Sequence, residues 1–514
     1  MYIILLGVGT AQQWIDMDNI TDKWANGQLK LTTRQAYQLH GVIKRNLKTT
    51  MAHINYAAMT TLSACGDVCR NVLSSPNPET CGMTHIYDEV QHWCQAISDH
   101  LKPRTGAYHE IWLDKKLVTT TPSSALDVEP MYGRTYLPRK FKVAIAIPPY
   151  NDTDVFTQGC VGLIAIVDEE TKTVLKGFNV YVGGGMGQHH NNKETFPCVA
   201  QFMGFCKPGD IVKVCEGILI VQRDHGDRVN RKHARIKYTL RDHGMPWYRG
   251  KVETFAGFKF QPEQKYKFLH NGDRYGWARN DTDGTWAITI FIQNGRVKDV
   301  EGYPLKKALR HIADSFLYTE FRLTANQNLT IARINDDDKT RMMDMMKMYN
   351  IDNSRYTGLH RSSMACVALP TCALALAESE RYLPSLIDKL AEVIDESGLR
   401  EKDINIRMTG CPNGCARPYV AEIAFVGRAP GLYNLYLGGG HMGQRLAKLY
   451  MEAIDEEAIL KALTPLIRAY AVNREDGEHF GDWVIRAGYV AETHDSEQKF
   501  NDWWENTGQK RFDY

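Results

Sequence analysis

Apolar and polar residues along the chain follow two different periods, which predict a mixture of strands and helices. Short apolar runs at 142–147 and 218–222 are rich in valine, isoleucine and leucine, as buried strands are. Longer stretches repeat their apolar residues every three or four positions, which is typical of amphipathic helices. Three of them are predicted as helices, at 306–316, 382–396 and 457–470. We therefore expect an α+β or mixed α/β architecture.

Segments of the first half recur in the second half in the same order. Two pairs are close and a third is weaker: 177–188 (GFNVYVGGGMGQ) with 432–444 (LYNLYLGGGHMGQ), 29–41 (LKLTTRQAYQLHG) with 321–333 (FRLTANQNLTIAR), and 70–78 (RNVLSSPNP) with 364–372 (MACVALPTC). Chance similarity between glycine-rich turns does not explain three matches in one order. We infer an internal duplication with pseudo-twofold symmetry. A duplicated protein tends to place a shared site where its halves meet.

Composition narrows the class of protein. A chain of 514 residues with 43% hydrophobic and 24% charged residues is expected to be globular and to hold more than one domain. Its formal net charge of +2 argues against a nucleic-acid or membrane-surface protein. The apolar run that opens the chain is too short to span a bilayer and lacks the basic region of a signal peptide. Twelve cysteines are too dilute for a disulfide scaffold, so we expect a reducing, cytoplasmic compartment.

Four cysteines in the last third of the chain are spaced as C-x5-C and C-x3-C: Cys366, Cys372, Cys411 and Cys415. Four thiolates are the number that a [4Fe–4S] cluster takes. Prolines and a glycine beside them favour non-helical backbone, whose N–H groups can point at cluster sulfurs. The other eight cysteines are scattered singly. A zinc site or buried reduced thiols are the alternatives, although zinc sites usually use C-x2-C knuckles.

Together, these motifs resemble those of a known protein family. TGCPNGCARP at 409–418, its C-x5-C partner, TYLPRKFK at 135–142, RLTANQNL at 322–329 and the VGGG repeats resemble the sirohaem and [4Fe–4S] sulfite and nitrite reductases. The resemblance is closest to the haemoprotein (beta) components of NADPH-dependent assimilatory sulfite reductases, and it runs from about Gly7 to the end. It implies a six-electron reduction of sulfite to sulfide, in sulfate assimilation and cysteine biosynthesis. A sirohaem-dependent reduction of nitrite to ammonia is the alternative, and a non-enzymatic cluster-binding scaffold is a third possibility.

The resemblance also implies a domain organisation. A small ferredoxin-like domain would be assembled from two halves, and two larger domains would hold sirohaem and the cluster. The boundaries that we expect are 1–60 for the first ferredoxin-like half, 61–255 for the first sirohaem-binding domain, 256–345 for the second ferredoxin-like half and 346–514 for the sirohaem/[4Fe–4S] domain.

Cofactor ligands follow from the same resemblance. Cys415 aligns with the thiolate that bridges the cluster to the sirohaem iron, and the other three cysteines would bind cluster iron only. Sirohaem carries eight carboxylates, so its pocket must supply cations and donors. The candidates are Thr32, Arg34, Gln38 and His40, which share one face if 30–40 is a single strand, then Arg235, Lys237 and Gln327. For the basic run 228–237, a solvated helix face is the alternative. Lys30 stands where the family more usually has arginine.

The substrate site of the family needs cations on the distal face of the haem. Arg70, Lys140 and Lys142 align with the side chains that bind the anion. The two lysines are two residues apart and would face the same side of a strand. Arginine can hold an oxyanion with its fork, and lysine can pass on protons. An exposed pair of charges on an edge strand is the alternative. Nitrite reductases of the family tend to have a neutral residue in place of the second lysine.

Two further expectations concern what the chain lacks. Neither VGGG segment has the strand, G-x-G-x-x-G and helix context of a dinucleotide site, so electrons are expected from a separate NADPH-dependent flavoprotein with FAD and FMN. The opening residues 1–6 (MYIILL) do not resemble the family's lead-in. We therefore expect a truncated start: an incomplete first ferredoxin-like half, with its first strand and one distal arginine missing and a sheet edge left open.

Overall fold

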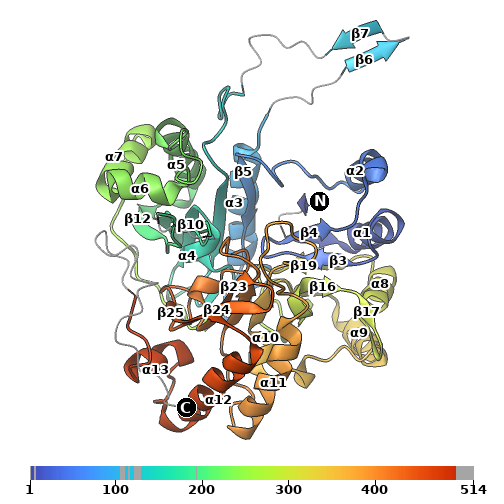
Figure 1. The fold of residues 1–514 in the computed structure, drawn as a ribbon. Helices are drawn as coiled ribbons and strands as arrows, with labels where there is room; N and C mark the ends of the chain where they lie inside the picture. Colours follow the sequence, from blue (N-terminus) through green and yellow to red (C-terminus); the bar gives the residue numbers. More distant parts are fainter. Residues whose placement is uncertain are drawn as a thin grey trace.

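The computed structural model describes residues 2–4, 7–104, 110–113, 116–120, 129–190, 192 and 194–493. Within this part, the chain forms two large layered units and a smaller unit that lies beside both of them (Figure 1). No helix of the described residues is both long enough and apolar enough to cross a membrane.

The first large unit is built on a five-stranded sheet in the order β12-β11-β10-β8-β5. Its strands are β5 (Cys69–Leu73), β8 (Phe141–Ala146), β10 (Val161–Val167), β11 (Leu175–Val182) and β12 (Gln201–Cys206). The first three are parallel, and β11 and β12 return antiparallel. The first expected strand, 142–147, is thus confirmed as β8.

The second large unit repeats this plan strand for strand. Its strands are β21 (Ser363–Ala365), β22 (Ile406–Thr409), β23 (Ile423–Ala429), β24 (Leu432–Leu437) and β25 (Lys448–Ile454). Again the first three are parallel and the last two antiparallel. The duplication inferred from the sequence is confirmed, and each GGG segment follows the fourth strand of its sheet.

Each large sheet has helices on one face and the other sheet on its second face. The helices are α3 (Ile86–Leu101), α5 (Ile211–His225) and α7 (Met245–Ala256) on the first sheet, and α11 (Leu383–Glu396), α12 (Glu456–Asn473) and α13 (Phe480–Arg486) on the second. Between the sheets, Ile164 and Ile166 share a buried cluster with Ala424 and Val426. The result is a helix–sheet–sheet–helix stack whose two halves bury apolar surface against each other.

The smaller unit is assembled from both halves of the chain. Its strands are β1 (Tyr2–Ile4), β2 (Val8–Thr10), β3 (Leu29–Leu31), β4 (Ala36–Leu39), β14 (Gly276–Arg279), β15 (Trp286–Ile290), β16 (Arg296–Val297), β19 (Glu320–Leu323) and β20 (Leu329–Ile334). The halves exchange strands, because β2 pairs with β19 and β16 pairs with β3. Helices α1 (Ala11–Trp24) and α8 (Leu305–Ser315) complete one common core.

Local chemistry explains where α1 begins. The Thr10 hydroxyl accepts a hydrogen bond from the Gln13 N–H (3.1 Å), and the Gln13 side chain accepts one from the Thr10 N–H (3.0 Å). This capping box satisfies two donors that a helix start leaves without partners. Other described elements are α2 (Leu47–Tyr56), α4 (Val155–Gln158), α6 (Ile236–His243), α9 (Asp336–Met348), α10 (Gly358–Arg361), β6 (Glu110–Leu113), β7 (Lys116–Thr120), β9 (Tyr150–Asn151), β13 (His270–Asn271), β17 (Asp299–Val300) and β18 (Tyr303–Pro304).

The three helices predicted from periodicity are confirmed as α8, α11 and α12, but the strand predicted at 218–222 is wrong. These residues form the buried side of α5, with Ile218, Leu219 and Val221 in the core. A run of four apolar residues does not distinguish a strand from a buried helical turn.

The single strand predicted at 30–40 is a hairpin in the structure. The chain turns at Thr32–Gln35, where the Thr32 N–H donates to Ala36 O (3.1 Å) and Gln35 adopts φ 48°. The expected open edge is also wrong, because β1 pairs antiparallel with β4, with Tyr2 opposite Gln38.

The turns of the two hairpins fix how the halves correspond. Gln35 and Gln327 both have positive φ, and each donates from Nε2 to an edge-strand carbonyl: Gln35 to Ser74 O (2.8 Å) and Gln327 to Ala365 O (3.0 Å). Ser74 is therefore the structural counterpart of Ala365. The weak sequence match of 70–78 with 364–372 is out of register by three residues.

The repeated glycines serve close packing of the backbone. A Cβ on Gly184 would lie 2.4 Å from Phe156 O, and one on Gly439 would lie 2.2 Å from Ala421 O. Each loop therefore packs directly against the backbone of an earlier segment of its own half, around Phe156 or Ala421. Only glycine, which has no Cβ, allows so close an approach.

We predict that Gly439→Ala lowers the midpoint of thermal unfolding, because the new methyl group overlaps a carbonyl oxygen and overpacking costs about 1–3 kcal/mol. Gly250→Ala in α7 is the matched control. A Cβ there meets no heavy atom within 4 Å, and alanine favours a helix, so its midpoint should equal or exceed that of the parent. Equal midpoints for Gly439→Ala and the parent, measured by circular dichroism, would contradict this account.

Candidate active site

One cavity brings together most of the residues that the sequence singled out. It has a volume of about 210 Å³ and lies between the β3–β4 hairpin, the β5–β8 edge of the first sheet and the cysteine loops of the second half. Its lining includes Thr32, Arg34, Gln38, Arg70, Lys140, Lys142, Gln327, Cys366 and Cys415. The cavity is therefore shared by the two halves, as a duplicated protein is expected to arrange its site.

Lys140 and Lys142 contribute buried amino groups to a cavity that other basic residues also line. None of the described residues that line it is acidic. Burial, with the positive charge of Arg235 next, lowers the pKa of Lys140 to about 8. Burial and then the charges of Arg34 and Lys140 hold the pKa of Lys142 well below its usual value. Buried ammonium groups that face other cations favour a bound anion, which would restore their charged forms.

Arg34 lies at the tip of the hairpin and is held by backbone carbonyls. Its Nη1 donates to Gln158 O (3.0 Å), and its Nη2 donates to Val143 O (3.3 Å) and to Asn71 O. Its Nε is buried and has no partner within the described part of the chain. Burial lowers the pKa of Arg34 to about 9. The hairpin turn thus packs a guanidinium against α4, β5 and β8 of the first half, and Thr32, Arg34 and Gln38 do not share one strand.

Arg70 lies on β5 at the wall of the cavity. Its guanidinium donates from Nε (3.0 Å) and Nη2 (2.8 Å) to Gly66 O and from Nη1 to Ala64 O (2.9 Å). Burial lowers its pKa. The side chain is therefore positioned by the loop that precedes its own strand.

The cysteine loops follow the carboxyl ends of two neighbouring parallel strands, β21 and β22. All four thiols are free, and the N–H of Gly410 donates to Cys366 Sγ at 3.4 Å. Burial first, and then the neighbouring thiols Cys415 and Cys411, raise the pKa of Cys366 to about 12. Cys372 acts on Cys411 in the same way. The four sulfurs are therefore neighbours, and the Gly410 N–H points at one of them.

Contacts with the first half hold the second cysteine loop in place. The Thr33 hydroxyl donates to Cys415 O (3.3 Å), and the Gln188 N–H donates to Pro412 O (3.0 Å). A Cβ on Gly414 would lie 2.9 Å from Met186 Cβ. The loop that carries Cys415 is therefore fixed against the first GGG segment.

Three predicted cofactor residues lie outside the lining of the cavity: Lys237, Arg235 and His40. Lys237 is buried, and its ammonium donates to the carbonyls of Gly185 (3.2 Å), Gly187 (2.9 Å) and Phe196. Burial lowers its pKa to about 7. In this structure Lys237 stabilises the first GGG loop.

Arg235 directly precedes α6, and its Nη2 lies 3.7 Å from Cys160 Sγ. Its positive charge contributes to the lowered pKa of Lys140. His40 lies beyond Gln38, and burial lowers its pKa to about 4. Lys30, which was noted as a departure from the family, lines the cavity but is paired at 2.6 Å with the buried Glu380.

A buried ion-pair network beside the cavity was not found from the sequence. Asp154 Oδ2 lies 2.6 Å from Arg407 Nη1 and 2.5 Å from Arg417 Nε. Burial alone would raise the pKa of Asp154, but the two arginines bring it below its usual value. Arg417 lies two residues after Cys415, within the cysteine motif. The motif was therefore the one sequence feature that could have pointed to this ion-pair network.

The donors present fit the cofactors that the sequence resemblance implies. Five basic residues line the cavity and none of its described lining residues is acidic; Lys30 is paired with Glu380, which leaves Arg34, Arg70, Lys140 and Lys142. The Nε of Arg34 is buried without a partner in the described part of the chain. A tetrapyrrole with many carboxylates would supply the acceptor that Arg34 Nε lacks. Four free thiols in one site suit an iron–sulfur cluster.

Comparisons with known proteins agree with this chemistry. The sequence model of the nitrite and sulphite reductase 4Fe-4S domain matches residues 92–260 and 357–493. That of the nitrite/sulfite reductase ferredoxin-like half domain matches 3–55 and 278–349. The chain belongs to the nitrite and sulfite reductase family. All four cysteines and both lysines of the cavity lie within the matches to the 4Fe-4S domain of this family.

Similar members of the family include proteins named sulfite reductase [NADPH] hemoprotein beta-component. That of Staphylococcus saprophyticus is 53% identical over 493 residues, which cover 96% of this chain and 84% of the relative. That of Geobacillus kaustophilus is 54% identical over 491 residues, which cover 95% and 84%. The solved structure of the Mycobacterium tuberculosis NirA protein has the same fold, with a TM-score of 0.75 at 22% identity, and covers 97% of this chain and 84% of that one.

We predict that Asp154→Asn strongly destabilises the protein. It leaves Arg407 and Arg417 as buried charges without compensation, which costs about 3–5 kcal/mol. Asp168→Asn is the control, because that carboxylate pairs with Lys176 at the surface, where ion pairs contribute little. Thermal unfolding of both variants should show a large fall only for Asp154→Asn. A common midpoint would show that the network is dispensable.

Proposed function

We propose that this chain reduces sulfite to sulfide at a sirohaem coupled to a [4Fe–4S] cluster, in sulfate assimilation and cysteine biosynthesis. The observation that carries the proposal is the shared cavity, where cations of the first half face the cysteine loops of the second. The names of the similar relatives support sulfite over nitrite as the substrate.

Cys366, Cys372, Cys411 and Cys415 are the proposed ligands of the cluster. Of these, Cys366 and Cys415 reach the cavity, and Cys415 is the exposed one. Its exposure at the cavity supports the proposal that Cys415 would help to hold both the cluster and the sirohaem. The Gly410 N–H, which donates to Cys366, would tune the cluster by hydrogen bonding to its sulfur.

Arg34, Thr32, Gln38 and Gln327 are the proposed contacts of sirohaem within the cavity, and His40, Arg235 and Lys237 are proposed at its margin. When bound, sirohaem and the cluster supply an iron that takes the substrate and a path for single electrons. The free Nε of Arg34 and the fixed turn around it provide a charged donor that needs no reorganisation.

Arg70, Lys140 and Lys142 are the proposed substrate-binding residues. Reduction of SO₃²⁻ to S²⁻ takes up six electrons and six protons and releases three waters, so the site must both hold an anion and deliver protons. Ammonium groups whose pKa is lowered by burial release protons more readily than ordinary lysines. The Arg70 guanidinium can add a bidentate contact once the anion competes with the loop carbonyls.

Electrons are proposed to come from a separate NADPH-dependent flavoprotein that carries FAD and FMN. The similar relatives are named as NADPH enzymes, and the glycine-rich loops of this chain lie against its own backbone. A reducing cytoplasm suits the free thiols of the site.

The cluster assignment is tested by Cys372→Ser. We predict that the purified variant loses both the cluster and sirohaem, because the two groups share a thiolate and the surrounding fold. Iron, labile sulfide and the visible absorption spectrum are the measurements. Cys415→Ser should have the most severe effect, since it also removes the haem ligand.

Cys65→Ser and Cys81→Ser are matched controls, because both thiols are exposed and lie outside the motif. They should keep parental iron and sulfide. Full cluster content in Cys372→Ser would show that the ligand set is wrong.

The substrate site is tested by Lys142→Ala. We predict a fall in sulfite turnover of about 100-fold with an unchanged cofactor spectrum, because a cation that stabilises the transition state is lost. Lys142→Asn should raise the ratio of nitrite to sulfite activity. Lys176→Ala removes an exposed lysine of β11 and should leave both activities unchanged. Parental kinetics of Lys142→Ala with both anions would refute the role of this lysine.

A further inference from the structure

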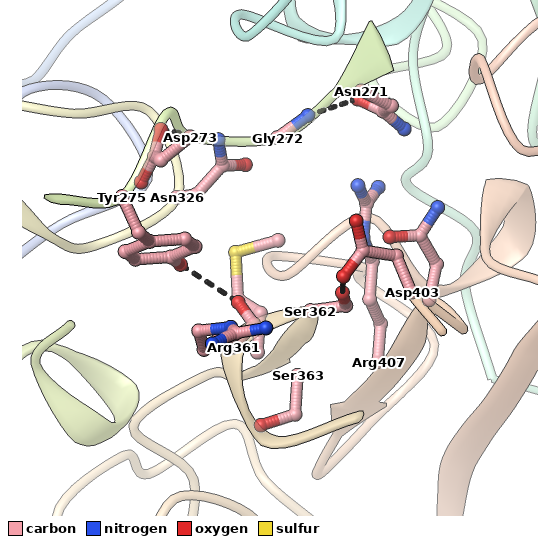
Figure 2. A pocket seen from close by; sticks show the side chains of 12 residues that line it. Asn271, Gly272, Asp273, Tyr275, Asn326, Arg361, Ser362, Ser363, Asp403 and Arg407 are labelled. Atoms are coloured by element: carbon pink, nitrogen blue, oxygen red, sulfur yellow. Dashed lines mark hydrogen bonds between the residues drawn. The ribbon is translucent and has the colours of Figure 1, made fainter. Parts of the chain in front are cut away.

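The structure contains a second polar cavity, of about 300 Å³, at a symmetry-related place in the fold. It is lined by Asn271, Gly272, Asp273, Tyr275, Asn326, Arg361, Ser362, Ser363, Met364, Asp403, Asn405 and Arg407 (Figure 2). Its volume is at the lower end of the range for small-molecule sites. The roles proposed for the first cavity use none of these residues.

The hairpins and edge strands place this cavity as the counterpart of the first. Ser74 corresponds to Ala365, and four positions before each of them lies an arginine that lines its cavity: Arg70 on β5 and Arg361 at the end of α10. The matching hairpin turns likewise put Asn326 at the place of the first hairpin's arginine, one residue before the glutamine. One arginine is thus retained, and the other is replaced by an amide.

The adjoining strands continue the correspondence. Val143 pairs with the first residue of β10, and Ile406 pairs with the first residue of β23. The residues one and three before Val143 are the two lysines of the first cavity. Those before Ile406 are Asn405 and Asp403. The second cavity therefore has an amide and a carboxylate where the first has two ammonium groups.

This exchange changes the charge that the cavity can accept. The first cavity has cations without an acidic lining residue, which suits an anion. The second has Arg361 and Arg407 as cations, with Asp403 and Asp273 as acids. Asp273 is already satisfied by three donors, at 2.7 to 2.9 Å. Asp403 accepts only from the Ser362 hydroxyl, at 3.4 Å, within the described part of the chain.

Arg407 also keeps a donor without a partner. Its side chain is buried, with 4% exposure, and Nη1 is paired with Asp154, but Nε has no partner among the described residues. Arg407 belongs to β22 and Asp403 to the loop that precedes it, and the two lie together on one wall of the cavity, with Gly272 and Asn271 across from them (Figure 2). Burial raises the pKa of Asp403, so a neighbouring cation would stabilise its charged form.

We propose that the second cavity binds a small zwitterion of the α-amino-acid class. Its carboxylate would be held by Arg361 and Arg407, and its ammonium group by Asp403. Arg361 at present pairs with the exposed Glu401, at 2.8 Å, which an incoming carboxylate can replace. Charge-assisted contacts at both ends explain why one lysine of the first cavity is here a carboxylate while an arginine is retained.

The proposal is tested with the purified full chain carrying its cofactors, by isothermal titration with L-alanine. Lactate lacks the ammonium group and ethylamine lacks the carboxylate, so each should bind about ten-fold more weakly or worse. Sulfite, which belongs to the first cavity, should not displace L-alanine. Absence of saturable L-alanine binding in the millimolar range would overturn the proposal.

Asp403→Asn keeps the shape of the side chain and the acceptor for Ser362, so it should fold and keep the sirohaem spectrum while L-alanine affinity falls about ten-fold. Arg361→Gln should weaken L-alanine by a similar factor and leave ethylamine unaffected. Glu392→Gln, an exposed change on α11, is the control and should bind as the parent does. Parental affinity in Asp403→Asn would refute the assigned site even if the chain binds amino acids elsewhere.

Discussion

The arrangement of both cavities depends on one buried carboxylate. Asp154 belongs to the first half, and its two arginine partners belong to the second. Arg407 forms part of the wall of the second cavity, and Arg417 lies two residues beyond Cys415. Because two guanidinium groups share one carboxylate, the network is a strongly directional contact in a place without solvent. Through this one carboxylate, both the loop that carries Cys415 and strand β22 are held against the first half.

Sequence alone was sufficient for the parts of the site that lie close together in the chain. The C-x5-C and C-x3-C spacing placed four thiols that the structure brings to one site, and the short spacing of the two lysines placed both in one cavity. The turn at Thr32–Gln35 was missed because it has neither glycine nor proline, and Gln35 takes a positive φ instead. The pairing of Lys30 with Glu380 joins residues 350 apart and has no local signal.

Duplication gives this protein two copies of one scaffold with different chemistry. The backbone contacts that define the scaffold are retained, including the two glutamines that hold the edge strands and the glycines that lie against carbonyls. The side chains at the strand starts have diverged, so that Lys140 of the first cavity has a carboxylate, Asp403, as its counterpart in the second. Scaffold and chemistry are separable here because the retained contacts involve backbone atoms, whereas the cavities are defined by side-chain ends.

The exchange of strands in the smaller unit sets an order for biosynthesis. Strand β2 at residues 8–10 obtains its partner only when β19 at 320–323 has left the ribosome. The amino-terminal part therefore cannot complete its fold until more than half of the chain has been made. Until then, a sheet edge is unpaired and apolar residues such as Trp14 are exposed. Cofactor insertion must come later still, because the cysteines at 366–415 follow β19 in the chain. Synthesis at low temperature or with abundant chaperones thus favours the yield of loaded protein.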